Sequence, residues 1–188
     1  MTETRRRRSA PATKAAILEA ARARFSAEGF ERVRLRDVAA DVGVDAAMVV
    51  RYFGTKDNLF AEAAELRLDL PDLTGVPPEE LAATLLPRFF EVWEDNAFLS
   101  LLRASATSDT ARAKMQALFV TQVLPVLTAA AVDQPERRAA LLGTQILGLA
   151  FSRYVLGIGP VSAMSRAEVM AWLGPVVRHY LTGDPDGL

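Results

Sequence analysis

Apolar residues recur every three or four positions along most of this 188-residue chain, a spacing that predicts helices with one buried face. No stretch alternates apolar and polar residues as a half-buried strand would, and no segment repeats. We therefore expect an all-α fold. With capping residues and glycines as boundaries, the spacing predicts about nine helices, over residues 13–28, 35–42, 46–53, 56–68, 79–95, 98–107, 110–131, 135–156 and a last helix ending near Leu181.

Polar residues mark the start of several of these helices. Thr55, Asp109, Asp133 and Ser165 each stand at or just before a predicted start, where a side-chain oxygen can accept from a free backbone N–H. A glutamate follows three residues after Asp133 and three after Ser165, which is capping-box spacing. We expect all four residues to be N-caps.

A loop rich in proline and glycine at residues 71–78 separates the first four predicted helices from the others. The first twelve residues are basic and show no helical period, so we expect a disordered arm there. The chain is therefore divided into the arm at 1–12, a first domain at 13–60 and a second at 61–188.

Pro87, Pro125 and Pro175 lie inside apolar helical patterns, where each removes a backbone hydrogen bond at a cost of about 3 kcal/mol. Two interpretations stay open. Each proline kinks a helix or begins a new one around the core, or Pro87 and Pro125 hold two helices apart and leave a cavity. The side chains that could line such a cavity are Phe89, Phe90, Trp93, Leu102, Phe119 and Phe151.

Composition excludes several classes of site. The chain has no cysteine, so it forms neither disulfides nor thiolate metal sites. His179 is the only histidine, which leaves no Ser-His-Asp arrangement and no histidine-based metal site. The apolar run at 139–151 is too short to span a membrane, and the basic N-terminus lacks the apolar stretch of a signal peptide. We expect a cytoplasmic protein with no catalytic residues, cofactor or metal.

Charge is divided unevenly along the chain. Residues 1–56 hold 12 Lys and Arg against 7 Asp and Glu, a net charge of +5, and residues 57–188 hold 10 against 16, a net of −6. Without Arg5 to Arg8 the first part is nearly balanced, at 8 against 7, but its other bases gather at Arg32, Arg34, Arg36, Arg51 and Lys56. This cluster indicates a surface that meets phosphates.

The cluster surrounds a pattern typical of a helix-turn-helix. Ala39 allows two helices to approach, Gly43 supplies the turn, and Val49 fills the crease between them. Asp45 can cap the second helix of the pair. The helical period turns Met48, Val49 and Phe53 inward, and it leaves an outward face that could meet a DNA groove, made of Ala46, Ala47, Val50, Arg51 and Tyr52.

At these residues the chain resembles the TetR family of bacterial transcriptional repressors. The resemblance covers residues 13–60. Its motifs are Ile17, Leu18, Ala21, Phe25 and Gly29-Phe30 in the first helix, Asp37-Val38-Ala39 and Gly43-Val44 at the turn, and Tyr52-Phe53 with 55–59 at the fourth helix. It implies that Lys56 contacts a phosphate; its alternative role is that of a solvated surface residue.

Three positions depart from the family pattern. Arg34 stands where a hydroxyl residue usually caps the second helix, so another group must cap it. Val50 replaces a tyrosine that generally reaches a phosphate, and it offers only an apolar contact, for instance to a thymine methyl. Asp45 replaces a serine and brings a negative charge near DNA. The full predicted DNA-binding set is Arg34, Arg36, Asp45, Ala46, Ala47, Val50, Arg51, Tyr52 and Lys56.

The second domain is expected to bind a small apolar effector and a second copy of the chain. Trp93 suits the wall of a pocket, although aromatic residues at helical spacing are more often ordinary core. The predicted ligand set is Phe89, Trp93, Leu102, Phe119, Gln122 and Phe151. Two late helices have apolar faces wider than a pair can bury, and pairing in a four-helix bundle, as the resemblance implies, would cover them. The predicted interface is Leu142, Ile146, Leu149, Ser152, Val169, Trp172, Val176 and Tyr180.

These observations predict a homodimeric repressor that binds a pseudo-palindromic operator on double-stranded DNA and is released by a small apolar effector. An architectural protein that coats DNA would explain the bases but not the large apolar second domain. A small helical enzyme is the third alternative, and it lacks a recognisable site. Arg5 to Arg8 are read as a nonspecific electrostatic arm or an idle terminus rather than a minor-groove reader.

Overall fold

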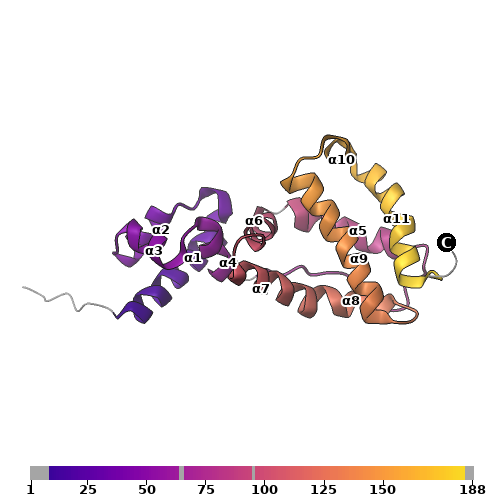
Figure 1. The fold of residues 1–188 in the computed structure, drawn as a ribbon, viewed down its shortest axis with the longest axis horizontal. Helices are drawn as coiled ribbons and strands as arrows, with labels where there is room; N and C mark the ends of the chain where they lie inside the picture. Colours follow the sequence, from indigo (N-terminus) through magenta and orange to yellow (C-terminus); the bar gives the residue numbers. More distant parts are fainter. Residues whose placement is uncertain (1–8, 64–65, 95, 185–188) are drawn as a thin grey trace, which may run out of the picture.

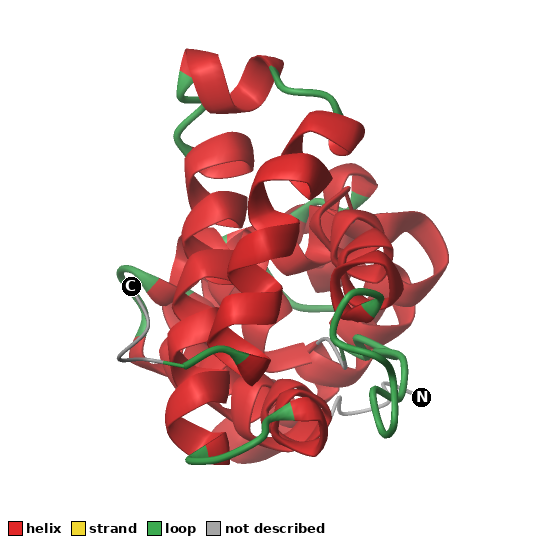
Figure 2. Ribbon diagram, turned by 90° about the vertical axis from the view of Figure 1, so that its right-hand side faces the viewer, coloured by secondary structure: helices red, strands yellow, loops and turns green. Residues whose placement is uncertain are grey.

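The computed structural model describes residues 9–63, 66–94 and 96–184. In this part of the chain the fold is helical with no strand, as expected (Figure 2). The helices are α1 (Ala10–Arg32), α2 (Leu35–Val42), α3 (Ala46–Phe53), α4 (Lys56–Ala63), α5 (Leu81–Glu94), α6 (Asn96–Ser105), α7 (Asp109–Leu118), α8 (Leu124–Ala130), α9 (Pro135–Ala150), α10 (Gly159–Ala163) and α11 (Arg166–Thr182). Two π-helical turns, η1 (Phe119–Val123) and η2 (Phe151–Val155), continue α7 into α8 and extend α9.

The molecule is elongated, with α1, α2 and α3 at one end and α5, α8, α9, α10 and α11 at the other (Figure 1). Each end has its own apolar core. The first gathers residues of α1 to α4 around Ile17 and Val49, and the second gathers residues of α5, α6, α8, α9 and α11 around Leu85 and Leu142. A small third cluster lies where α4, α6 and α7 meet, at Ala61, Leu101 and Leu118. The two cores are thus joined through these three helices.

Helix α4 is shorter than predicted. It ends at Ala63, and residues 66–68 are not helical. The apolar spacing predicted a helix to Leu68. Leu68 is buried, at 3% exposure, but it reaches the core from a segment that is not helical. Asp69 follows with φ of 45°, in the left-handed region that few non-glycine residues adopt, and this conformation prevents a helix from continuing.

Helix α1 is longer than predicted. Its N-cap is Ser9, whose hydroxyl accepts from the Ala12 N–H, so the helix includes residues assigned to the arm. At its other end Gly29, with φ of 76°, kinks it before Arg32. The rest of the predicted arm, including Arg5 to Arg8, lies outside the described residues. The short α10 was not predicted, because Gly157 and Gly159 are typical of a turn.

The predicted caps are half right. Thr55 accepts from the Asn58 N–H at 3.1 Å, and Ser165 and Glu168 form a complete capping box. The cap of α7 is Ser108 rather than Asp109. Asp133 does not cap α9, because its carboxylate pairs with the buried guanidinium of Arg138 at 2.5 Å, which also lowers the pKa of Asp133.

The three prolines occupy different places. Pro87 and Pro175 lie inside α5 and α11, and Pro125 lies in the first turn of α8, directly after η1. The sequence singled out only the run at 139–151, but the continuous helix from Asp109 to Ala130 is long and apolar enough to cross a membrane by length and composition. A single helix of this kind is weak evidence for a membrane protein.

Candidate DNA-binding surface and effector cavity

The turn between α2 and α3 has the predicted geometry. Gly43 is left-handed, with φ of 71° and ψ of 39°, and its N–H and that of Val44 bond to the last carbonyls of α2. Ala39 and Val49 are buried, at 2% and 0% exposure, where the two helices meet. These local choices fix α3 at an angle to α2, which is the arrangement that presents a helix to the major groove.

The helix starts also match expectation. Asp45 caps α3 by accepting from the Ala47 N–H at 2.7 Å. Arg34 stands at the N-cap of α2 and offers no side-chain cap. Its backbone carbonyl instead accepts from the N–H groups of Asp37 and Val38. The first turn of α2 is therefore tightened by backbone bonds rather than by a hydroxyl.

The outward face of α3 divides into two groups. Ala47, Val50 and Arg51 are exposed, with Val50 at 48%. Ala46 and Tyr52 are half-buried and pack against the first core, and the Tyr52 ring lies 6.3 Å from that of Phe53. On the inward side Val49 and Phe53 belong to the core, whereas Met48, which the period turned inward, is only half-buried. The freely accessible part of the helix is thus the Ala47–Val50–Arg51 strip.

The basic residues around α3 have different surroundings. Arg34 and Arg36 are exposed, and Arg36 lies 3.7 Å from its neighbour Asp37. Lys56, at the start of α4, is half-buried. Its ammonium donates to the Glu31 carbonyl at 3.1 Å. The sequence left two roles open for Lys56, contact with a phosphate or a solvated surface position. In the structure, without DNA, its ammonium is bonded to the end of α1.

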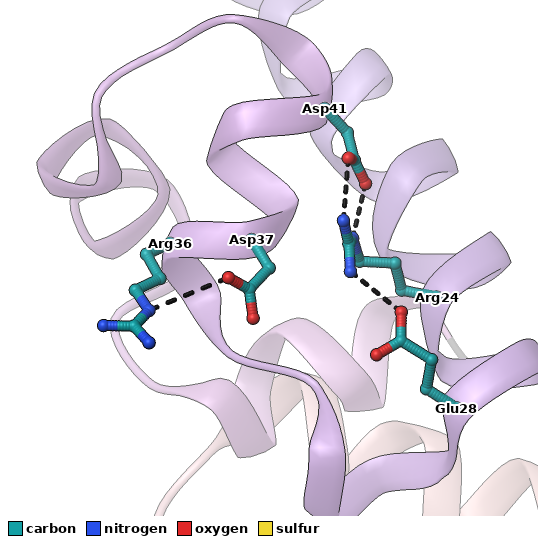
Figure 3. Close-up of polar contacts among 5 residues, drawn as sticks. All are labelled: Arg24, Glu28, Arg36, Asp37 and Asp41. Carbon is teal, nitrogen blue, oxygen red and sulfur yellow. Dashed lines mark hydrogen bonds and ion pairs between the residues drawn. The ribbon is translucent and has the colours of Figure 1, made fainter.

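An ion-pair cluster that sequence reasoning missed holds α1 against α2 (Figure 3). Two nitrogens of Arg24 donate to the two carboxylate oxygens of Asp41, at 2.5 and 2.8 Å, and a third donates to Glu28 at 2.8 Å. The hydrogen bonds from Arg24 lower the pKa of Asp41, and those to Asp41 raise the pKa of Arg24. Only the four-residue spacing of Arg24 and Glu28 could be read from the sequence.

Helix α1 is also tied to α4. The Lys14 ammonium lies 3.0 Å from the Glu62 carboxylate, and Arg22 Nε donates to the Ala63 carbonyl at 3.1 Å. Both partners lie in the last two residues of α4. A displacement of that end of α4 would therefore act directly on α1, and through Arg24 and Asp41 on α2.

A cavity of about 630 Å³ lies in the second lobe, between α5, α7, η1 and α9. Its lining contains no acidic or basic side chain. At its rim stand exposed residues such as Val120, Thr144 and Leu147, so the cavity opens to solvent. The lining residues are Leu68, Phe89, Trp93, Phe98, Met115, Gln116, Leu118, Phe119, Val120, Val123, Ala140, Gly143, Thr144, Ile146 and Leu147.

Three of the six predicted ligand residues, Phe89, Trp93 and Phe119, lie on this cavity wall. Trp93 is also core, at 1% exposure, with its ring 5.8 Å from that of Phe89. Leu102 and Phe151 pack in the same lobe without lining the cavity. The sixth, Gln122, does not line the cavity, and its amide bonds to backbone groups of Leu66 and Leu68. Ligand binding by any of them stays a prediction.

The cavity depends on a close approach that the sequence did not reveal. A Cβ atom on Gly143 would lie 2.6 Å from Cε2 of Phe119, well inside contact distance. Glycine therefore lets the Phe119 ring of η1 lie directly on α9. Gly143 thus serves packing inside one chain.

The predicted dimer residues fall into three places. Leu149, Ser152, Val169 and Trp172 line a groove of about 450 Å³ between α9 and α11, and Trp172 is 76% exposed. Leu142 and Ile146 are buried in the chain's own core, at 0% and 5%, so they have no surface for a partner. Val176 and Tyr180 are half-buried and do not line the groove. Within the described residues no cluster of His, Asp or Glu could hold a metal ion.

Several known proteins are similar to this chain. A curated relative, the HTH-type transcriptional repressor SCO4008 of Streptomyces coelicolor, is 36% identical over 75 residues, which are 39% of this chain and 39% of that protein. Among solved structures, a TetR-family regulator (SCO0857) of Streptomyces coelicolor is 25% identical, with 94% of this chain and 98% of that chain covered and a TM-score of 0.43. NalD of Pseudomonas aeruginosa, the secondary repressor of the MexAB-OprM multidrug efflux pump, is 19% identical, with 94% and 100% covered and the same TM-score.

Family models match both parts of the chain. The model of bacterial regulatory proteins of the tetR family matches residues 17–63, which hold α2, the turn and α3. The model of the tetracyclin repressor-like C-terminal domain matches residues 79–181, more than half of the chain. The chain therefore belongs to the TetR family of DNA-binding bacterial regulators.

Proposed function

We propose that this protein is a transcriptional repressor that binds an operator as a homodimer and leaves it when an uncharged apolar molecule fills the cavity of the second lobe. The observation that carries the proposal is the pairing of two features in one chain. One is the exposed strip of α3, flanked by Arg34, Arg36 and Lys56. The other is a 630 Å³ cavity without a charged side chain, joined to α4 by the segment that contains Leu68.

The positive charge of Arg51 and the small side chains of Ala47 and Val50 suit this strip to contact with a DNA groove. Ala47 and Val50 are small enough for close approach, and Val50 offers methyl groups that suit a thymine methyl. Arg51 supplies the one strongly directional donor of the strip, for a guanine or a phosphate. Lys56 and the exposed Arg34 and Arg36 would neutralise backbone phosphates on either side.

The exposed Trp172 supports a dimer through α9 and α11. A tryptophan that is 76% exposed beside an apolar groove is unusual on a monomer surface and typical of an interface anchor. The proposed interface is therefore Leu149, Ser152 and Trp172, with Val176 and Tyr180 at its edge, while Val169, at 2% exposure, belongs to the chain's own core. Two copies related by a twofold axis would present two α3 helices to successive major grooves, about 34 to 36 Å apart.

The residues that line the cavity determine the charge and polarity of the effector that we propose. Phe89, Trp93 and Phe119 offer aromatic faces, and nothing in the lining would neutralise a charge, whose burial costs several kcal/mol. The effector is therefore neutral and mostly apolar, with at most a few polar atoms near Gln116 and Thr144. We place this repressor in the cytoplasm, where DNA and a membrane-permeant apolar molecule would both be available.

The test is selection of DNA sites from a random pool, followed by footprinting and sizing of the complex. We expect an enriched inverted repeat bound by two copies. Binding that does not distinguish the enriched site from random DNA would favour the architectural alternative, and a monomer that protects an asymmetric site would overturn the dimer. Mass spectrometry of the protein purified under native conditions then tests for a neutral molecule retained in the cavity.

A further inference from the structure

The segment that joins α4 to α5 is held on one side by the side chain of Gln122 in η1. The Leu68 N–H donates to Gln122 Oε1 at 2.7 Å, and Gln122 Nε2 donates to the Leu66 carbonyl at 2.9 Å. A primary amide has one acceptor and one donor side by side, so it pairs with these two backbone groups as a neighbouring parallel strand would. We call this pair of bonds the Gln122 clamp.

The other side of the same segment is bonded to α5. Arg88 Nε donates to the Leu68 carbonyl at 2.7 Å, and the Arg88 guanidinium lies 3.7 Å from the Asp69 carboxylate. The left-handed backbone of Asp69 turns the chain immediately after these contacts. Leu68 is therefore fixed between η1 and α5 through its backbone, while its side chain is buried at 3% exposure.

Both ends of the clamp border the cavity. Leu68 forms part of the wall from the joining segment, and Phe119, Val120 and Val123 form part of it from η1, on either side of Gln122. A molecule that enters between these side chains contacts Leu68 and η1 together, so a displacement of either wall acts on the clamp. Hydrogen bonds of 2.7 and 2.9 Å weaken steeply when their groups shift. The clamp is thus placed to report whether the cavity is filled.

We propose that Gln122 is the positioning residue that couples the cavity to the DNA-binding lobe, a proposal that rests on the proposed function. Leu66 lies three residues after Ala63, the end of α4, and Ala63 and Glu62 are bonded to Arg22 and Lys14 of α1. Filling the cavity opens the clamp, releases Leu66 and frees the end of α4. Gln122 of η1 is bonded to Leu66 and Leu68, and α1 is bonded to Glu62 and Ala63, so the two sets of contacts lie close together along the chain.

The first experiment uses the unchanged protein. N-phenyl-1-naphthylamine, a neutral apolar dye that fluoresces in apolar surroundings, serves as the probe. Hydrogen exchange is followed at residues 66–68 and in α4, with and without saturating probe. We expect exchange of the Leu68 amide to be accelerated about tenfold or more, and that of the α4 amides to rise with it. Bound probe with unchanged exchange at both places would overturn the inference. Absence of any fluorescence rise would remove the cavity as a site, and with it both proposals.

The second experiment separates this inference from the proposed function. In the wild type the probe should weaken affinity for the selected inverted repeat by about 5- to 150-fold, the usual range of allosteric coupling. Gln122→Leu removes both clamp bonds and should bring this ratio to within about twofold of one, with probe binding retained. Thr121→Val removes the hydrogen bond of the neighbouring exposed side chain of η1, which does not line the cavity; it is the control and should keep the wild-type ratio.

Each outcome of this experiment has a distinct meaning. If Gln122→Leu responds to the probe like the wild type, the inference falls and the proposed function stands. If the probe accelerates exchange both at 66–68 and in α4 but leaves DNA affinity unchanged in the wild type, the effector response falls and the coupling of the cavity to α4 stands. Should Gln122→Leu fail to fold, Gln122→Glu keeps the acceptor for Leu68 N–H and loses the donor to Leu66, and its ratio should lie between those of the wild type and one.

Discussion

The Lys56 ammonium lies 4.3 Å from the centre of the Phe30 ring, a cation–π contact that binds the start of α4 to the end of α1. With the bond to the Glu31 carbonyl, it holds the charge in a fixed place at a helix N-terminus. A positive group held at such a position is ready to meet a phosphate without being ordered first.

Lys56→Ala should weaken binding to all DNA sequences alike and reduce the salt dependence of log K by about one unit, because one phosphate contact is lost. The measurement is a DNA titration over a series of salt concentrations. Lys114→Ala removes an equal charge from α7 and should leave the slope unchanged. An unchanged slope in Lys56→Ala, with a lower melting temperature, would show that Lys56 serves only the contact between α1 and α4.

The Arg24–Asp41 pair predicts a pH dependence. The pKa of Asp41 is lower in the folded than in the unfolded chain, so the pair stabilises the fold above the ordinary aspartate pKa of about 3.9, and this stability is lost as the pH falls through the folded pKa. Asp41→Asn should therefore lower the free energy of unfolding at pH 7, and the difference from the wild type should vanish in acid. Urea unfolding at several pH values measures it.

Asp37→Asn is the matched control for this pair. Asp37 lies on the same helix, and its ion-pair contact is a 3.7 Å approach to the adjacent, largely exposed Arg36 (Figure 3). Such surface contacts contribute little to stability. Asp37→Asn should therefore unfold nearly as the wild type does across the whole pH range. Equal behaviour of the two variants would mean that the bidentate bonds to Arg24 are as weak as an ordinary surface pair.

Trp93→Ala should be strongly destabilising, by about 3–5 kcal/mol, because it removes a ring that is 1% exposed from the core of the second lobe. Thermal or urea unfolding checks this. The variant cannot isolate a role in the cavity. Val120→Thr can, because Val120 is 57% exposed and the change keeps the shape while adding a hydroxyl to an apolar wall. It should weaken binding of the neutral dye with little change in stability, and unaltered dye affinity would place the dye elsewhere.

Trp172→Glu should convert the dimer to a monomer, because a carboxylate in the apolar groove between α9 and α11 would be buried without a partner. Analytical ultracentrifugation measures the change in mass. Val132→Glu makes the same substitution at a residue that is 64% exposed, outside the groove, and should leave the dimer intact. A dimer that survives Trp172→Glu would place the interface on another face.

Features that depend on residues close by in the sequence could be predicted from the sequence. The turn at Gly43, the Asp45 cap and the burial of Val49 each depend on residues within one or two helical turns, so spacing alone predicts them. The capping box at Ser165 is of the same kind. In these places residue chemistry and local geometry leave few alternatives.

Features that depend on residues far apart in the sequence could not be predicted. Gln122 looked like a polar group for a ligand, but its partners, Leu66 and Leu68, lie more than fifty residues away in the chain. Leu68 looked helical because burial has the same signature in a helix and in an extended segment over a few residues. Leu142 and Ile146 were predicted at the dimer interface because the sequence does not distinguish an apolar helix face that packs inside its own chain from one that packs against a second subunit.

The π-helical turn η1 has a consequence for how the chain tolerates change. Its defining bond, from the Leu124 N–H to the Phe119 carbonyl, takes one residue more than an α-helical turn and so rotates everything after it by about 100° relative to an unbroken helix. Deleting a single residue from 119–123 would therefore restore the regular helix and keep Leu127 on its buried face, because the π turn already takes up one extra residue. The same deletion in the regular turns of α7 would rotate all of α8 by about 100° and turn Leu127 out of the core.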